Sequence, residues 1–448
     1  MANLRSTDPA PMTGPSAGPS AGLSGRRRVQ AFAFGGLLLV LMNFSGPDAG
    51  MIDIPVSFFL KNRMHLKANE LAVFKLWIGI PLILGFGFGF IRDRWSPFGR
   101  GDRAHILFFG LLTALIYGLM ALMTPGYAVF LGGLFVATMA FKMVSSAVYG
   151  VVNTLAQRHA VTGQMSSLIN IGSCLPALIS CIGGGVLSQT LGGQNAEAAA
   201  RILFCCAGGL MVSIAVLGFI GPKWVFDEAR EEVPTMHFMA DLRRIAGHWP
   251  IYPVMLIQLL WQFGPAGGTV LQYHLVDHWH GTDAQWGLWQ GLFQFSFLPF
   301  CALYGWLSQK FSLRTLLWVG FSIAVVQAVP LLFVHDAVGA LYAAVPLGFM
   351  GALGQSALVD LVIRSAPRGC QGATMMLFYG CFFFSGRAGD LLGTWIYDKH
   401  GGFIPTVIVT IIVYALILPV LLLVPKRLTA TKDGEVIKED GSHQPVTS

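Results

Sequence analysis

Apolar residues come in long blocks along this chain, separated by short polar or basic segments. A block of about twenty such residues crosses the roughly 30 Å apolar core of a bilayer as a helix. The apolar windows predict twelve spans, near residues 29–58, 69–91, 104–123, 127–152, 164–188, 201–221, 251–275, 284–307, 314–334, 338–361, 371–397 and 403–424. The pattern therefore predicts an all-α membrane protein with twelve transmembrane helices.

Composition supports this class. The chain is 54% hydrophobic and 11% charged, whereas soluble domains are about 25% charged. Residues 1–28 are rich in Pro, Ser, Gly and Ala at their start and predict a disordered cytoplasmic tail. The apolar run that follows is too long for the core of a cleaved signal peptide, so we expect a retained first helix.

The basic residues predict the orientation. With the N-terminus inside, 21 of the 29 Lys and Arg residues fall on the inner side, five on the outer side and three within spans. This bias predicts a multi-pass protein of the inner membrane with both termini in the cytoplasm. It also explains the net charge of +7 without a nucleic-acid partner. The seven cysteines show no paired loop spacing, so neither a disulfide framework nor a metal site is expected.

An internal repeat predicts the domain organisation. NFSGPDAG in the first half is matched by WQFGPAGG in the second, which aligns Gly46-Pro47 with Gly264-Pro265, and GFIRDRW is matched later by GWLSQKF. We therefore predict two pseudo-symmetric six-helix halves, 29–221 and 251–424, a cytoplasmic linker 222–250 and a cytoplasmic tail 425–448. A parallel repeat of this kind places a substrate site between the halves near mid-membrane. A twelve-helix channel or scaffold with a duplicated bundle is the alternative.

The repeated Gly-Pro has a physical reading of its own. Proline lacks the N–H that continues a helix, and its ring clashes with the carbonyl of the preceding turn. Inside a membrane, such freed backbone is tolerated where it lines a cavity. Both Gly-Pro pairs therefore predict helix breaks beside a cavity.

The segment GFIRDRWSPFGRGDR, residues 89–103, carries a glycine, an Asp-Arg pair and a second Gly-Arg pair. It resembles the loop signature of the major facilitator superfamily; the matching positions are Gly89, Asp93, Arg94, Gly99 and Arg100. The resemblance implies a cytoplasmic latch in which Asp93 faces the start of the eleventh helix, near residues 371–374. The alternative is that the loop is merely basic and cytoplasmic. The second-half copy has Gln309 where Asp93 stands.

A narrower stretch resembles the folate-biopterin transporter branch. It consists of FFLK at residues 58–61, followed by Asp93, Phe98-Gly99 and a basic residue at position 103. This resemblance implies a small organic substrate.

Ionisable side chains at bilayer depth are costly and are therefore candidates for function. Rise along the predicted helices places Asp48, Lys75, Arg387 and Asp390 in one outer layer. A Lys75–Asp390 pair between the halves would form an outer gate. The alternative is that Arg387 and Asp390, three residues apart, neutralise each other. We expect Asp53 in outer water.

Further candidates lie nearer the middle of the membrane. Lys142 could bind an anionic solute or pair with an acid of the first span; alternatively it snorkels or serves only structure. Asn43 and Asp48 occur beside the first Gly-Pro only, and Asp48 is the better candidate for proton coupling. Gln262, beside Trp261, suits a planar solute or simply packs. The remaining polar groups predict less: Asp360 and Arg364 as a local surface pair or latch, His274 as a neighbour of Gln262, and His278 and His280 as a weak metal candidate.

Neither a phosphate-binding loop nor a zinc-protease motif is present in the sequence, so we do not expect an enzyme or a cofactor. We expect a monomeric secondary transporter in the bilayer. It would move a small organic solute, anionic or aromatic, by alternating access with proton coupling. The rival class is a non-transporting membrane scaffold or assembly factor on the same fold.

Overall fold

The computed structural model describes residues 25–48, 50–66, 68–191, 196–230, 243, 245–367, 369–399, 402–433, 435–437 and 443–445. The first half of the chain forms α1 (Gly25–Ser45), α2 (Gly50–Asn62), α3 (Ala68–Ile83), α4 (Gly85–Arg94), α5 (Asp102–Leu122), α6 (Tyr127–Arg158), α7 (Thr162–Leu191) and α8 (Ala196–Ile220). The second half forms α11 (Ile251–Gln262), α12 (Gly268–Tyr273), α13 (Asp283–Lys310), α14 (Leu313–Val325), α15 (Ala337–Ser365), α16 (Gln371–Lys399), α17 (Phe403–Ala415) and α18 (Ile417–Leu421).

Short elements connect or follow these helices. They are the 3-10 helices η1 (Pro97–Gly99) and η3 (Val329–Phe333), the π-helix η2 (His274–His278), α9 (Lys223–Arg230), α19 (Lys426–Thr429) and the antiparallel strands β1 (Glu435–Ile437) and β2 (His443–Pro445).

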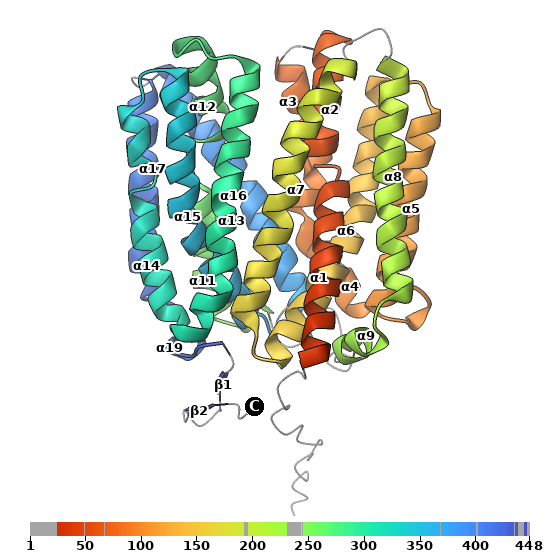
Figure 1. Cartoon of the computed structure of the whole chain (residues 1–448), viewed down its shortest axis with the longest axis vertical. Helices are drawn as coiled ribbons and strands as arrows, with labels where there is room; N and C mark the ends of the chain where they lie inside the picture. The colour runs from red at the N-terminus through yellow and green to blue at the C-terminus, as the bar shows by residue number, and fades with distance from the viewer. Residues whose placement is uncertain are drawn as a thin grey trace, which may run out of the picture.

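The two halves stand side by side as separate helical bundles (Figure 1). Helix α1 begins, and α19 lies, at the same end of the molecule, which we call the terminal end; the opposite end is the far end. The predicted fold, an all-α membrane protein with two six-helix halves, is confirmed.

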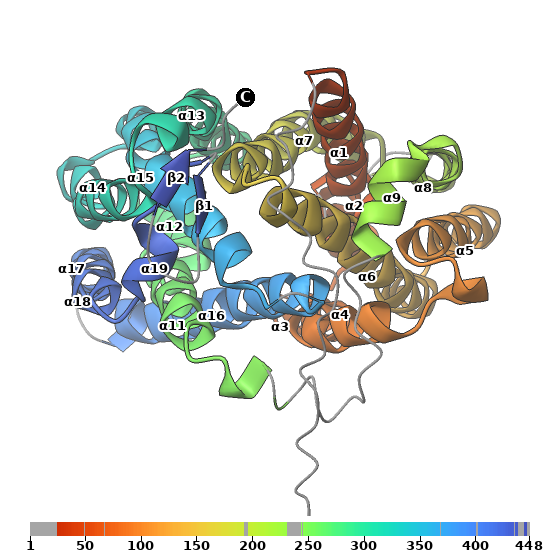
Figure 2. The ribbon, with the colours of Figure 1, turned by 90° about the horizontal axis from the view of Figure 1, so that it is seen from below.

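The lengths of the helices fit a membrane. Among the described residues, eight helical segments are long and apolar enough to cross a bilayer. Three further helices, α7, α13 and α16, have 30, 28 and 29 residues, enough to cross at 1.5 Å per residue. These three follow the seam between the halves: α7 packs on α13, and α16 packs on α4 and α6 (Figure 2). The seam is therefore where a site between the halves must lie.

Both predicted helix breaks are present. Residues Gly46–Asp48 separate α1 from α2, and residues 263–267 separate α11 from α12. Neighbouring helices satisfy the freed backbone: the Tyr117 hydroxyl donates to the carbonyl of Ser45 at 2.9 Å, and the amide of Ala266 donates to the Thr410 hydroxyl at 3.0 Å. At each break, a side chain of a neighbouring helix thus replaces a backbone hydrogen bond, as expected for irregular backbone within a membrane.

Some predicted boundaries are wrong or lie outside the described residues. Helix α1 begins at Gly25, four residues before the predicted first span, so the three arginines at 26–28 are helical rather than part of the tail. Residues 1–24 and the linker residues 231–242 are outside the described part of the chain.

Candidate functional site

A cavity of about 190 Å³ opens between the halves. The α1–α2 break, α2, α3, α6 and α16 line it, and it brings together four charged residues: Asp48, Asp53, Lys75 and Arg387. Three of these, Asp48, Lys75 and Arg387, were expected in one layer from their depth in the sequence. The aromatic ring of Phe383 and the hydroxyl-bearing Thr138 complete its polar and aromatic lining. The cavity therefore offers both charges and an aromatic surface to a solute.

The ion pairs around this cavity differ from the predicted gate. Lys75 Nζ lies 2.9 Å from Asp53 Oδ2, so Asp53 is not simply in outer water. Asp390 instead accepts a hydrogen bond from the Thr269 amide at 3.3 Å and lies 4.0 Å from Arg387. The predicted Lys75–Asp390 pair is thus wrong in this conformation. Helices α2 and α3 are consecutive neighbours, so Asp53 reaches Lys75 without crossing the seam.

The Lys75–Asp53 pair is expected to contribute little to stability. Lys75 and Asp53 are each about one-third exposed, and solvent screens such pairs to about 0–1 kcal/mol. Lys75→Ala is expected to lower the free energy of unfolding by less than about 1 kcal/mol. A double-mutant cycle by thermal unfolding should give coupling between 53 and 75 and additivity between 75 and 390. Coupling of Lys75 with Asp390 instead would restore the gate hypothesis.

Lys142 on α6 is the most buried cation near the cavity. Its residue is 6% exposed, and Nζ lies 5.8 Å from the ring centroid of Phe141 and 5.4 Å from that of Phe383. Asp48 is the acid whose charge acts on it. Yet Lys142 forms no salt bridge among the described residues. A buried ammonium without a close counter-ion is costly, so an anionic ligand would stabilise it.

A polar contact between the halves lies about two helical turns from Lys142. The side chain of Tyr149, also on α6, interacts with Asn43 of α1, Ser173 of α7 and Tyr379 of α16. The rings of Tyr149 and Tyr379 have centroids 4.9 Å apart. Asn43 also donates an amide N–H to the carbonyl of Leu39 at 2.9 Å. Asn43 thus lies beside the Tyr149–Tyr379 contact at the seam.

Two other candidates lie in the second half, away from the cavity. Gln262 ends α11 and is not among the residues that line the cavity; its neighbour Trp261 donates to the side-chain oxygen of Gln355 at 2.6 Å and packs on Tyr414. His274 stacks on Phe403 with centroids 4.4 Å apart. These aromatics pack, which was the alternative interpretation. No group of three potential metal ligands occurs among the described residues.

At the terminal end, Asp93 closes the seam as the resemblance implied. Its Oδ2 accepts the amide N–H of Ala373 at 2.9 Å, in the first turn of α16. At Gly89 a Cβ atom would collide with the backbone of Ala373, so only glycine permits this approach. Arg92, which the sequence did not single out, is buried and pairs with both Asp93 and Asp102. A negative side chain at a helix N-terminus is favourable, and Arg92 holds it in place.

The remaining loop positions have lesser roles in this arrangement. Gly99 adopts a left-handed backbone with φ of 65°, which favours glycine. Arg100 is exposed and Arg94 is half-buried.

A second closing contact comes from the C-terminal segment. Asp433 is 8% exposed and accepts the amide N–H groups of Gly163 and Gln164, both at 2.9 Å, in the first turn of α7. The hydroxyls of Thr162 and Ser308 donate to it as well, each at 3.2 Å. Asp433 therefore joins α7 of the first half to α13 of the second.

Arg364 anchors the same segment on α15. Its guanidinium contacts Asp360 at 2.8 Å, Asp433 at 3.5 Å and the carbonyl of Thr431 at 2.9 Å. Asp360 and Arg364 are buried side chains, so the prediction of a local surface pair is wrong and that of a latch describes them better. Burial and the charge of Asp360 raise the pKa of Asp433 to about 6, against the opposing effects of Arg364 and the two amides.

The two closing contacts are related by the repeat. Gly305, the counterpart of Gly89, approaches Ser167 of α7 closely. Gln309, the counterpart of Asp93, turns back and donates to the carbonyl of Gly305 at 2.8 Å. The second copy of the motif thus has no carboxylate at the α7 N-terminus, and Asp433 supplies one from the tail.

This geometry is that of the major facilitator fold, closed at the terminal end. The solved structure of the transporter FucP, in the outward conformation, has a TM-score of 0.62 at 15% identity and covers 88% of this chain and 99% of its own. That of the human organic anion transporter MFSD10 has a TM-score of 0.59 at 14% identity and covers 90% of this chain and 100% of its own.

The sequence gives a narrower match over part of the chain. Residues 45–235 match the profile of the BT1 family. No curated protein matches the chain significantly.

Proposed function

We propose that the protein is a secondary active transporter that moves a small organic anion with an aromatic part across the inner membrane. The observation that carries this proposal is Lys142, buried at the seam without a salt bridge among the described residues and set between Phe141 and Phe383. A carboxylate would neutralise the ammonium, and an aromatic group would pack on the rings. MFSD10, which has a similar fold, is named as an organic anion transporter, and this supports the anionic part of the proposal.

The basic residues give the direction in which the site opens. The 21 to 5 distribution of Lys and Arg supports a cytoplasmic terminal end. The closing contacts of Asp93 and Asp433 would then seal the cytoplasmic side, while the cavity of about 190 Å³ lies nearer the far end, toward the outside. We therefore assign the structure to the outward-facing state of an alternating-access cycle. The partial match to the BT1 family supports the folate-biopterin branch and makes folate the first solute to test.

Asp48 is our candidate for the proton site. It lines the cavity, is exposed there, and acts electrostatically on Lys142. Protonation of Asp48 would remove the negative charge that acts on Lys142. The ammonium would then favour a bound anion more strongly, which links proton binding to anion binding.

Uptake into proteoliposomes tests both parts. With folate and simpler aromatic carboxylates as solutes, the wild type should accumulate at least one of them when a proton gradient is imposed. A gradient of about one pH unit supports up to about tenfold accumulation per proton. Asp48→Asn should retain solute exchange and lose this accumulation. Gradient-driven accumulation that persists in Asp48→Asn would exclude Asp48 as the proton site.

A further inference from the structure

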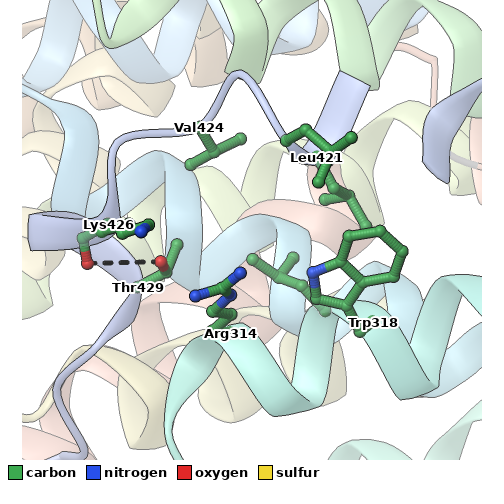
Figure 3. Close-up of a pocket in the computed structure, with 8 residues that line it drawn as sticks. Arg314, Trp318, Leu421, Val424, Lys426 and Thr429 are labelled. Atoms are coloured by element: carbon green, nitrogen blue, oxygen red, sulfur yellow. Dashed lines mark hydrogen bonds between the residues drawn. The ribbon is translucent and has the colours of Figure 1, made fainter. Parts of the chain in front are cut away.

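A second pocket lies at the terminal end, on the outer edge of the second half. It has a volume of about 110 Å³ and lies between α14 and the segment formed by α18 and α19. Figure 3 shows the guanidinium of Arg314 and the indole nitrogen of Trp318 facing the space next to Lys426 and Thr429. Leu421 and Leu422 form an apolar wall.

The pocket stands at the depth where the apolar core of a membrane ends. The apolar span Leu313–Phe333 begins one residue before Arg314, and the span Phe403–Leu421 ends five residues before Lys426. Helices α14, α17 and α18 are at the edge of the molecule in the view along the bundle (Figure 2). Leu422 is 69% exposed, which is favourable against lipid. The two cations therefore lie at headgroup level, and the exposed Leu422 beside them faces acyl chains.

The charge of the pocket is uncompensated within the described part of the chain. Neither Arg314 nor Lys426 forms a salt bridge there, and the pocket lining contains no acid. Arginine presents a planar fork of N–H donors that matches phosphate oxygens, and lysine adds a point charge. The pocket is small, at about 110 Å³, which suits a phosphate group rather than a whole solute.

We infer that this pocket binds the phosphate of an anionic phospholipid, with Arg314 and Lys426 on the phosphate, Trp318 at the interface and the acyl chains along α14 and α18. Phosphatidylglycerol and related lipids supply the net negative charge that two cations favour. Helix α19, which carries Lys426, leads directly into the segment that ends at Asp433. A bound lipid would therefore hold the base of the closing segment against α14.

Purified full-length protein in detergent can be titrated with phosphatidylglycerol, phosphatidylcholine or inorganic phosphate while thermal unfolding is followed. Phosphatidylglycerol should raise the melting temperature in a saturable manner. The double variant Arg314→Gln/Lys426→Gln should lose at least about tenfold in apparent affinity, because each cation near a membrane surface contributes about 1 kcal/mol. Arg427→Gln is the matched control, since Arg427 is exposed on the same helix and does not line the pocket.

The outcomes separate the possible ligands. A loss confined to the double variant supports the phospholipid site. Equal losses in the double variant and in Arg427→Gln would reduce the effect to diffuse attraction and overturn the proposal. A shift of the same size with inorganic phosphate alone would also overturn it, since the pocket would then serve a soluble anion.

Discussion

Lys142→Gln is expected to reduce the uptake of an anionic aromatic solute by about 100-fold or more. Losing one member of a buried ion pair costs about 3–5 kcal/mol, and each 1.4 kcal/mol is a factor of ten in affinity. The ion pair in question is the one that the bound anion would form with Lys142, which is 6% exposed and set between two rings. Uptake into proteoliposomes and solute binding in detergent would measure the loss.

Thermal unfolding of the same variant separates binding from structure. If Lys142 serves to bind a solute, its ammonium is a cost to the empty protein, and Lys142→Gln should leave the melting temperature unchanged or raise it. If Lys142 instead forms a structural pair with Asp48, the variant should melt lower. Lys75→Gln is the matched control, because Lys75 lines the neighbouring cavity, is about one-third exposed and is already paired with Asp53. A lower melting temperature with unchanged solute binding would contradict the proposed role.

Local rules were sufficient for much of the fold. The apolar blocks predicted the spans because a backbone that crosses a bilayer must satisfy its own hydrogen bonds, and a helix is one of the few structures that does so. The Gly-Pro pairs predicted both helix breaks because proline interrupts the hydrogen bonding of the helix in which it lies, whatever the rest of the fold. The contact of Asp93 with the start of α16 followed from a resemblance whose glycine spacing reflects close packing, as the approach of Gly89 to Ala373 shows.

Contacts between distant segments were less accessible. The partner of Lys75 depended on how α2 leans on α3, a detail that depth along a single helix does not contain. Tyr149 and Tyr379 meet only because α6 and α16 cross at the seam, and in the sequence each is an ordinary aromatic in an apolar run. Nothing in the sequence distinguishes Arg92 from the other basic residues of the segment 89–103, although it is buried between Asp93 and Asp102.

Asp433 was the contact furthest from any sequence signal. It lies in a polar tail with no helical or strand period, and its partners at Gly163 and Gln164 are about 270 residues away. One clue did exist: Gln309 occupies the place of the acid in the second copy of the motif. The second copy keeps the four-residue spacing from the glycine to this position but lacks the acid. Another residue must therefore cap α7, and the structure identifies it as Asp433.

Asp433→Ala is expected to shift the terminal end toward the open state by up to about 30-fold. The change removes a carboxylate that accepts two amide N–H groups of α7 and two hydroxyls, and loss of a helix N-terminal cap costs about 0.5–2 kcal/mol. Spin labels at Arg100 and Lys310, exposed positions on the two halves, would report the distance across the seam once the seven native cysteines are replaced by serine. Arg427→Ala, in the same segment, should leave the distance distribution as in the wild type.

The pH dependence of this contact has a definite sign. The pKa of Asp433 is about 6 when it is docked, and about 3.9 for a free aspartate. Between these values the docked carboxyl binds more protons than the free one, so docking is favoured at low pH and weakens as pH rises from about 4 to about 6. Above about 6 the contact should be independent of pH. Asp360, Arg364 and Tyr304 are the titratable or charged neighbours that act on it from α13 and α15.

In the wild type, the open state should therefore be more populated at pH 6 than at pH 4, with no further change at pH 8. The distribution of distances between the two spin labels would show this. Asp433→Asn cannot titrate and should remove this dependence, while a trend that remains would have to come from Asp93 or another acid. Opening that increases as the pH falls would contradict the assignment, because it would mean that the docked carboxyl has the lower pKa and that Arg364 and the α7 amides outweigh burial.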